Sequence, residues 1–241
     1  MAENSSIPDA IAPPQGLTRG RRLFALCVVL SVSFAHFIAT SSYRWWAGPS
    51  AYDSAAIQIR LLVALIAEVT SLLLLWFVLS EQGRTWRDIG WTLHWGDMLH
   101  GIGLIVASAL ATSGATMCFQ LLYRDVTGHW LQSRPVQGMW SFGPSVLSIL
   151  LAVVNPFFEE MIVRAYTMTE VKALGGSSTL AMLVSVLIQM SYHTYQGLLR
   201  GIGLTITFTL FSLYFSRKRR IAPVILAHLF SDVWPLVRAS S

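Results

Sequence analysis

Apolar residues along this chain fall into long runs that are separated by short polar segments. The runs cover residues 23–40, 57–79, 99–122, 144–168, 178–195, 200–216 and 221–237. Because about 20 apolar residues cross the hydrocarbon core of a bilayer, the pattern predicts about seven membrane-spanning helices. We therefore expect an all-α polytopic transmembrane helix bundle with no separate soluble domain.

The polar segments between the runs carry the signals expected at membrane boundaries. Residues 1–18 are rich in Pro, Ser and Ala, which predicts a disordered tail. Arg19, Arg21 and Arg22 follow, just before the first run. A signal peptide has this pattern, but the run and the tail before it are long, so we favour an uncleaved first helix. Tryptophans crowd the next three polar segments, as in an aromatic belt at the membrane surface.

Composition supports the same class of protein. Of 241 residues, 54% are hydrophobic and 12% are charged, about half the charge of a soluble domain. The formal charge of +5 comes from basic residues that cluster in loops, as membrane topology requires, so we expect a lipid bilayer and no nucleic acid as partner. Cys27 and Cys118 lie in apolar runs, which indicates small core hydrophobes rather than a disulfide or metal pair.

The distribution of Lys and Arg predicts an orientation. With the N-terminus inside, ten basic residues fall in inside segments and five in outside segments, and cytoplasmic loops carry the excess. We expect a multi-pass protein of a bacterial inner (cell) membrane, with a cytoplasmic N-terminus and the C-terminus outside.

Polar groups inside the apolar runs are the candidates for function. A charge at the bilayer centre costs roughly 2.5–3.5 kcal/mol on insertion scales, and such residues usually face the bundle interior. The runs contain His36, Glu68, Glu159, Glu160, Arg164, His193, His228 and Asp232. His36 alone is more typical of a packed histidine, and Glu68 fits a helix–helix hydrogen bond as well as a functional role.

The segment "NPFFEEMIVRAY" concentrates three of these residues. Glu160 and Arg164 are four positions apart, so on a helix they share a face and neutralise each other. Glu159 points about 100° away and has no partner nearby in the sequence, which leaves its carboxylate available for chemistry. Asn155-Pro156 lies one turn earlier, where proline is expected to kink the helix and open a polar pocket.

Two later runs add histidines. In "QMSYH", Gln189 precedes His193 by one turn, and in "HLFSD", Asp232 follows His228 by one turn and could orient the imidazole. A carboxylate and two histidines in a dry cavity suit activation of water by a general base and stabilisation of an oxyanion. The same residues, Glu159, His193 and His228, are also ordinary zinc ligands.

These motifs resemble those of the CPBP family, which comprises CAAX proteases and bacteriocin-processing enzymes, also called Abi proteins. "EEMIVR" matches the EExxxR signature, His193 occupies the second motif (FxxxH), and His228 with Asp232 occupies the third (Hxxx(N/D)). All three occur in order within about residues 144–235, each in an apolar run. "RTWRDIGWTLHWGDMLHGIG" is also similar to the segment that precedes the family's core.

The resemblance implies an intramembrane endopeptidase of the glutamate-dependent type. Glu159 and His193 would activate the attacking water, while His228 with Asp232 would bind the carbonyl oxygen. Glu160 and Arg164 would shape the site. No cofactor is expected, with zinc the disfavoured alternative. Two positions depart from the family: Gln189 replaces a phenylalanine, and Asp232 stands where eukaryotic-type enzymes have asparagine. An ionised Asp232 would repel an oxyanion, so it must be protonated or must orient His228 instead.

The sequence thus predicts a disordered tail at 1–18, N-terminal transmembrane helices at 19–143 and a catalytic core at 144–237. The predicted function is cleavage of a membrane-associated peptide or protein from the cytoplasmic half of the bilayer. A helical rise of 1.5 Å per residue places Glu159 and His228 ~8–10 Å from the inner edge but His193 ~22 Å from it, a mismatch that a tilted or late-entering fifth span would remove. Alternatives are a non-catalytic immunity or scaffold protein of the Abi type, and a transporter or proton relay, which the absence of an inverted repeat in the sequence disfavours.

Overall fold

The computed structural model describes residues 17–48, 54–132 and 145–240, and within these ranges the chain forms helices and turns but no strand. The elements are α1 (Arg19–Ala47), α2 (Ser54–Glu81), η1 (Trp86–Ile89), α3 (Asp97–Thr127), α4 (Val146–Glu159), η2 (Glu160–Tyr166), α5 (Thr167–Ala173), α6 (Ser178–Ser191), η3 (Thr194–Gln196), α7 (Leu198–Lys218) and α8 (Ala222–Ser240). Each predicted apolar run coincides with a helix, so the predicted all-α fold class is confirmed. Residues 1–16 of the predicted disordered tail lie outside the described residues.

Five helices among the described residues are long and apolar enough to cross a membrane. They are α1, α2, α3, the continuous unit formed by α4, η2 and α5 (Val146–Ala173), and α7. The apolar helix α6 has only 14 residues, or ~21 Å at 1.5 Å per residue, which is short of a ~30 Å hydrocarbon core. The seven expected spans therefore correspond to five full-length helices, the short helix α6, and helix α8, which carries the polar residues His228 and Asp232.

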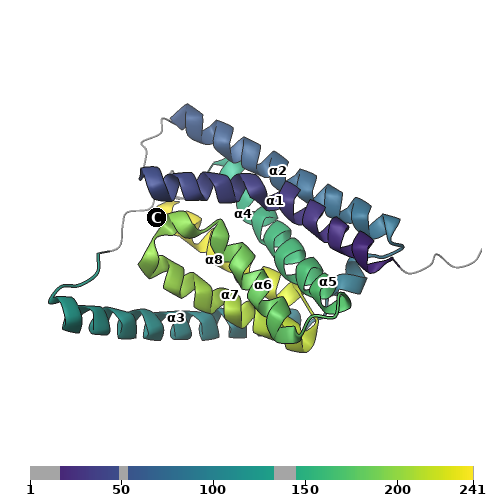
Figure 1. Ribbon diagram of the computed structural model, residues 1–241. Coiled ribbons are helices and arrows are strands. Elements are labelled where there is room, and N and C mark those ends of the chain that lie inside the picture. Colours follow the sequence, from purple (N-terminus) through teal and green to yellow (C-terminus); the bar gives the residue numbers. More distant parts are fainter. Residues whose placement is uncertain (1–16, 49–53, 133–144, 241) are drawn as a thin grey trace, which may run out of the picture.

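The Val146–Ala173 unit lies at the centre of the bundle. In its most apolar window 61% of residues are buried, against 6–28% in the other four long helices. Helices α1 and α2 pack together on one side of it, and α3 lies on the other side against α7 and α8 (Figure 1). The unit that carries both predicted glutamates is thus the one most removed from lipid.

The outer surface of the bundle is apolar. Phe24, Leu99 and Leu110 are each at least 70% exposed, as expected for side chains that face lipid. Cys27 and Cys118 are free thiols on this outer surface, so the prediction that they are core residues is wrong, although they form no disulfide. The reason is that hydrocarbon is as apolar as a protein core, and hydrophobicity alone does not tell the two environments apart.

One end of the bundle, which we call the basic end, is held by ion pairs. Glu170 on α5 is fully buried. It accepts one hydrogen bond from Arg84, in the turn after α2, and one from Nη1 of Arg22 on α1, at 3.1 Å. Arg220, in the α7–α8 turn, pairs with Asp97 at the start of α3. Segments that the predicted topology assigns to one side of the membrane therefore do meet at one end.

The α7–α8 turn is also fixed by the backbone. The amide of Ile221 donates to the carbonyl of Gly90 at 3.0 Å. Gly90 has a φ of +102°, and a Cβ there would stand 2.7 Å from the carbonyl oxygen of Arg219. Only glycine satisfies both constraints. Asp88, just before it, accepts bonds from the amide and hydroxyl of Thr85, which lower the pKa of its carboxyl.

Candidate active site

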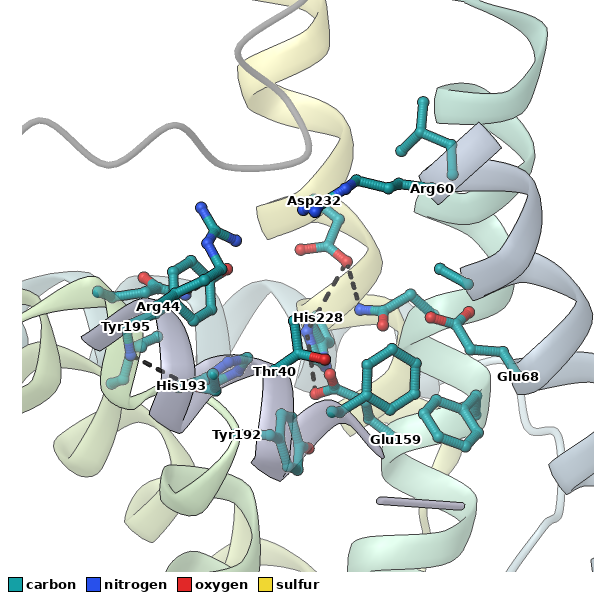
Figure 2. A pocket seen from close by; sticks show the side chains of 18 of the residues that line it. Thr40, Arg44, Arg60, Glu68, Glu159, Tyr192, His193, Tyr195, His228 and Asp232 are labelled. Carbon is teal, nitrogen blue, oxygen red and sulfur yellow. Dashed lines mark hydrogen bonds and ion pairs between the residues drawn. The ribbon is translucent and has the colours of Figure 1, made fainter. Parts of the chain in front are cut away.

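A cavity of about 700 Å³ opens into the bundle at the end opposite the basic end, which we call the cavity end. Its walls come from α1, α2, α4, α7, α8 and the turn between α6 and α7 (Figure 2). Glu159, His193, His228 and Asp232 all line it. The fold therefore brings four residues from three separated motifs to a common space.

The central helix changes its winding at the glutamate pair. The chain is α-helical as far as Glu159 and π-helical from Glu160 to Tyr166. Such π segments are rare and often occur at functional sites. Pro156 lies inside α4, four residues before the change, and removes one backbone donor there.

Glu160 points into the protein, away from the cavity. It is fully buried and forms an ion pair with Arg164, as the i, i+4 spacing predicted. Its other carboxylate oxygen accepts a hydrogen bond from Nδ1 of His228 at 2.7 Å. Arg164 is also fully buried, with its guanidinium 5.2 Å and 5.4 Å from the ring centroids of Phe208 and Phe211. Glu160 and Arg164 therefore form the packed base of the site.

Glu159 faces the cavity and is held by a residue from another helix. Its Oε2 accepts a hydrogen bond from the side-chain amide of Gln189 on α6 at 2.8 Å. The same oxygen lies 3.9 Å from Nε2 of His228, which is too long for a direct hydrogen bond. Glu159 is 4% exposed, so its carboxylate is almost dry but borders the open space.

His228 is oriented by Glu160, not by Asp232 as the sequence suggested. The Asp232 oxygen is 3.8 Å from Nε2 of His228, beyond hydrogen-bond range, and it accepts instead from the amide of Asn155 at 3.0 Å. Spacing along α8 brings the two side chains near each other, but the tertiary contacts decide their partners. Because Nδ1 donates to Glu160, Nε2 is the nitrogen presented to the cavity, between Glu159 and Asp232.

His193 lies in the turn after α6 and not within a helix. Its ring stacks on Phe208 at 5.3 Å between centroids and contacts Tyr192 edge-on. Its buried Nδ1 has no hydrogen-bond partner among the described residues. His193 and Glu159 are not hydrogen-bonded. Of the two predicted imidazoles, the one with a close approach to Glu159 in the structure is His228, at 3.9 Å.

The predicted depth mismatch between Glu159 and His193 is removed by the greater length of the central helix. The central helix continues to Ala173, which places Glu159 near its middle, ~21 Å from the basic end. Helix α6 starts at Ser178 at that end and stops at Ser191, so His193 lies ~22 Å from the same end. Glu159 and His193 are therefore about equally far from the basic end, and the depth of Glu159 relative to the membrane edge stays a prediction.

The position of the cavity makes two of the predictions incompatible, the N-in orientation and access from the cytoplasmic half. Its lining residues come mainly from the end of α1 and the beginnings of α2 and α7. With the N-terminus inside, these segments are on the outer side of the membrane. Access from the cytoplasmic half therefore does not fit the predicted N-in orientation.

Three residues beside the predicted set belong to the site. Gln189 was noted in the sequence only as a departure from a motif, and Asn155 only as a neighbour of a proline. Glu68, left open in the sequence analysis, lines the cavity from α2, is 2% exposed, and has one carboxylate oxygen without a partner among the described residues. A polar residue inside an apolar run was the available signal for all three. His36 also lines the cavity.

The side chains around the cavity do not form a ready-made metal site. Within the described ranges, no three His, Cys, Asp or Glu side chains are arranged so that they could hold a metal ion. Glu159 is hydrogen-bonded to Gln189, and His193 stacks on Phe208 and meets Tyr192 edge-on. The zinc alternative with Glu159, His193 and His228 as ligands would require these side chains to rearrange, and no step is derived through a metal.

The model of the family described as type II CAAX prenyl endopeptidase Rce1-like matches residues 141–234. No curated protein and no solved structure matches the chain. The matched segment contains all six predicted site residues, and the resemblance to CAAX proteases is confirmed. Helices α1 and α2, which supply much of the cavity wall, precede it.

Proposed function

We propose that this chain, whose residues 141–234 match the type II CAAX prenyl endopeptidase family, is an intramembrane endopeptidase that cleaves a membrane-associated peptide or protein. The observation that carries the proposal is the approach of Glu159 Oε2 to His228 Nε2, 3.9 Å apart at the buried end of a cavity about 700 Å³ in volume. A water beside these two atoms, off the line that joins them, would be within hydrogen-bond reach of both. Residues 144–237 would form the catalytic core, and residues 19–143 would complete the cavity.

Glu159 serves as the general base. Its carboxylate takes a proton from the water, and the resulting hydroxide attacks the carbonyl carbon of the peptide bond. Glu159 then returns the proton to the nitrogen of the leaving amine, so that the proton balance closes and a water has been added across the bond. A base positioned in this way typically contributes 10²–10⁴-fold to the rate.

His228 stabilises the oxyanion that forms during the attack. With Nδ1 donating to Glu160, a protonated His228 directs Nε2–H into the cavity, where it can donate to the negatively charged oxygen. Asp232, held by Asn155, adds electrostatic support to the imidazolium. His193, with its unpaired Nδ1 on the same cavity wall, orients the water or the substrate carbonyl.

The test compares membrane peptides from cells that carry the wild-type chain and cells that carry Glu159→Ala. We expect an uncut precursor in the variant and a loss of cleavage of at least 10²-fold with the purified protein. Glu81→Gln, which changes an exposed glutamate at the basic end, is the matched control and should cleave normally. If Glu159→Ala inserts normally and retains full activity, the assignment is wrong. If its cellular phenotype is unchanged while no cleavage is found in either protein, the non-catalytic role applies.

Metal dependence is examined with the same assay. The mechanism above needs no metal, so activity should persist after thorough chelation. Loss of activity on chelation, with recovery on adding zinc, would favour the zinc alternative.

A further inference from the structure

We propose that Glu68 of α2 is a specificity residue that holds a basic side chain of the substrate, on a residue next to the bond that is cut. The inference rests on the proposed peptidase function and adds the class of substrate that the site accepts. Glu68 lines the cavity but lies outside the segment 141–234 that matches the CAAX endopeptidase family. The mechanism above gives it no part.

Glu68 interrupts the face that α2 turns toward the inside of the bundle. The other buried residues of this helix are apolar or carry a hydroxyl, and they are Ile57, Leu61, Ser71, Leu75 and Leu79. The hydroxyl of Ser71 is satisfied within the helix, because it donates to the carbonyl of Ala67 at 2.7 Å. A buried carboxylate costs free energy unless a donor or a cation meets it. Glu68 therefore requires a partner.

The rest of the described chain does not supply this partner. Glu68 is 2% exposed, and its Oε2 accepts no hydrogen bond from the described residues. Glu159 and Asp232 lie within electrostatic range of it, and both are carboxylates as well. The hydrogen bond between helices that the sequence suggested for Glu68 is therefore not formed. A positively charged group that enters the cavity would complete this part of the wall.

The other two carboxylates on the cavity wall are already engaged. Glu159 and Asp232 each accept a hydrogen bond from a side-chain amide of a neighbouring helix. Asp232 also stands at the level of Arg60, near the mouth (Figure 2). Arg60 precedes Glu68 by eight positions on α2, which places it ~12 Å nearer the cavity end. Glu68 is thus the carboxylate of this wall that is left for a substrate.

Glu68 stands at the depth of the reacting atoms. Helices α2 and α4 both begin at the cavity end, and Leu61 of α2 and Leu151 of α4 belong to one buried cluster. Glu68 follows Leu61 by seven residues and Glu159 follows Leu151 by eight, so both glutamates lie ~10–12 Å deeper than the cluster. In Figure 2 the carboxylate of Glu68 points toward the space between Glu159 and Asp232. A group held there belongs to a residue beside the cut bond.

The chemistry of the wall favours an organic cation over a metal ion. The His, Cys, Asp and Glu side chains of the described ranges form no group of three that could hold a metal. A lysine or arginine side chain needs only one carboxylate for a charge-assisted hydrogen bond. Beside Glu68 the α2 wall is apolar and consists of Ile57, Leu61 and Ala64. The arrangement suits an apolar segment that is interrupted by one basic residue.

A binding experiment tests Glu68 without any need for cleavage. Glu159→Gln protein in nanodiscs of phosphatidylcholine is titrated with fluorescent Ala/Leu peptides, acetylated and amidated, that carry one central lysine or one norleucine. Binding to empty nanodiscs is subtracted. We expect the lysine peptide to bind about tenfold more tightly, the size of one charge-assisted hydrogen bond. Adding Glu68→Gln should remove most of this preference, and Glu68→Asp should retain part of it.

Glu81→Gln is the matched control, because it makes the same change on an exposed glutamate at the basic end. It should keep the full preference for lysine. Equal affinity for the two peptides, or a preference that survives in Glu68→Gln, would overturn the assignment. A norleucine peptide with a free N-terminus is the last arm. If it binds as tightly as the lysine peptide, the carboxylate recognises a chain terminus and the side-chain assignment is wrong.

A second measurement separates the specificity of Glu68 from the peptidase function. Active protein is given apolar peptides in which one lysine is moved stepwise along the sequence, and the products are identified by mass. The cut bond should move with the lysine. Cleavage at positions unrelated to the lysine would refute the role of Glu68 and leave the peptidase intact. Selective binding of lysine peptides with no cleavage of any peptide would refute the peptidase and leave the binding site.

Discussion

Adjacent glutamates in this protein acquire opposite roles from their partners. Glu160 is neutralised by Arg164. It also accepts a hydrogen bond from Nδ1–H of His228 and thereby orients that imidazole. Glu159 accepts a side-chain hydrogen bond from Gln189 and borders the cavity. The environment, and not the residue type, therefore separates the roles of the two glutamates.

At this scale we predict that Gln189→Leu slows catalysis and leaves substrate binding nearly unchanged. The amide holds the oxygen of Glu159 that faces His228 Nε2, and a hydrogen bond to a charged group is worth about 1.5–3 kcal/mol. We expect kcat to fall about tenfold or more with KM within about twofold. The assay is steady-state cleavage by the purified protein.

Gln120→Leu is the control, because Gln120, on the outer helix α3, bonds to the backbone of Leu131 just after that helix and does not line the cavity. A Gln189→Leu variant that raises KM without changing kcat would show that the amide contacts substrate and does not position the base.

At the scale of elements, two irregularities build the site. The π-helical segment η2 follows the α-helical turn that carries Glu159, and α6 ends about 9 Å short of a full membrane crossing. The second irregularity places a turn, with His193 and Tyr192, at the depth of the central glutamate. Regular full-length helices would have carried His193 farther from Glu159.

The ion-pair cluster on Glu170 should hold α5 against α1 and α2. Glu170→Gln leaves Arg22 and Arg84 without their shared carboxylate. Because both arginines are partly exposed, at 24% and 17%, we expect a loss of about 1–3 kcal/mol in the free energy of unfolding, less than for a fully buried pair. Thermal unfolding in detergent measures it. Glu81→Gln makes the same change on an exposed residue at the same end and should unfold like wild type. If Glu81→Gln lost as much free energy of unfolding, the cause would be the loss of one negative charge and not the ion pairs of Glu170.

At the scale of the whole molecule, charge and cavity lie at opposite ends. The basic end holds ten of the basic residues assigned to inside segments, whereas the cavity opens beside Arg44, Arg60 and Arg200. If the basic end faces the cytoplasm, as the positive-inside rule favours, the substrate enters from the outer side of the membrane.

Thiol labelling would test this orientation. In a protein with Cys27→Ser and Cys118→Ser, we expect an impermeant reagent to label Trp46→Cys in intact cells, and Lys172→Cys only after permeabilisation. Both positions are exposed, at opposite ends of the bundle. The parent without cysteines is the blank. The reverse pattern would place the N-terminus outside and the cavity on the cytoplasmic side.

The sequence alone determined the helical membrane fold and the Glu160–Arg164 pair. Both are local: a membrane span requires only a continuous apolar run, and an i, i+4 pair requires only helical periodicity. The sequence also named Glu159, His193, His228 and Asp232 as candidates, because charges in apolar runs are costly and seldom face lipid.

Only the tertiary structure decided which partner each side chain takes. Gln189 and Glu159 are 30 residues apart, Glu160 and His228 are 68 apart, and Asn155 and Asp232 are 77 apart, so no local pattern encodes these bonds. The same holds for the cysteines on the outer surface, for the position of Glu159 near the middle of the central helix, and for the end at which the cavity opens. Apolar surface is equally stable against lipid and against protein. Helix packing therefore decides which side chains face lipid and which face the bundle interior, and packing depends on the whole chain.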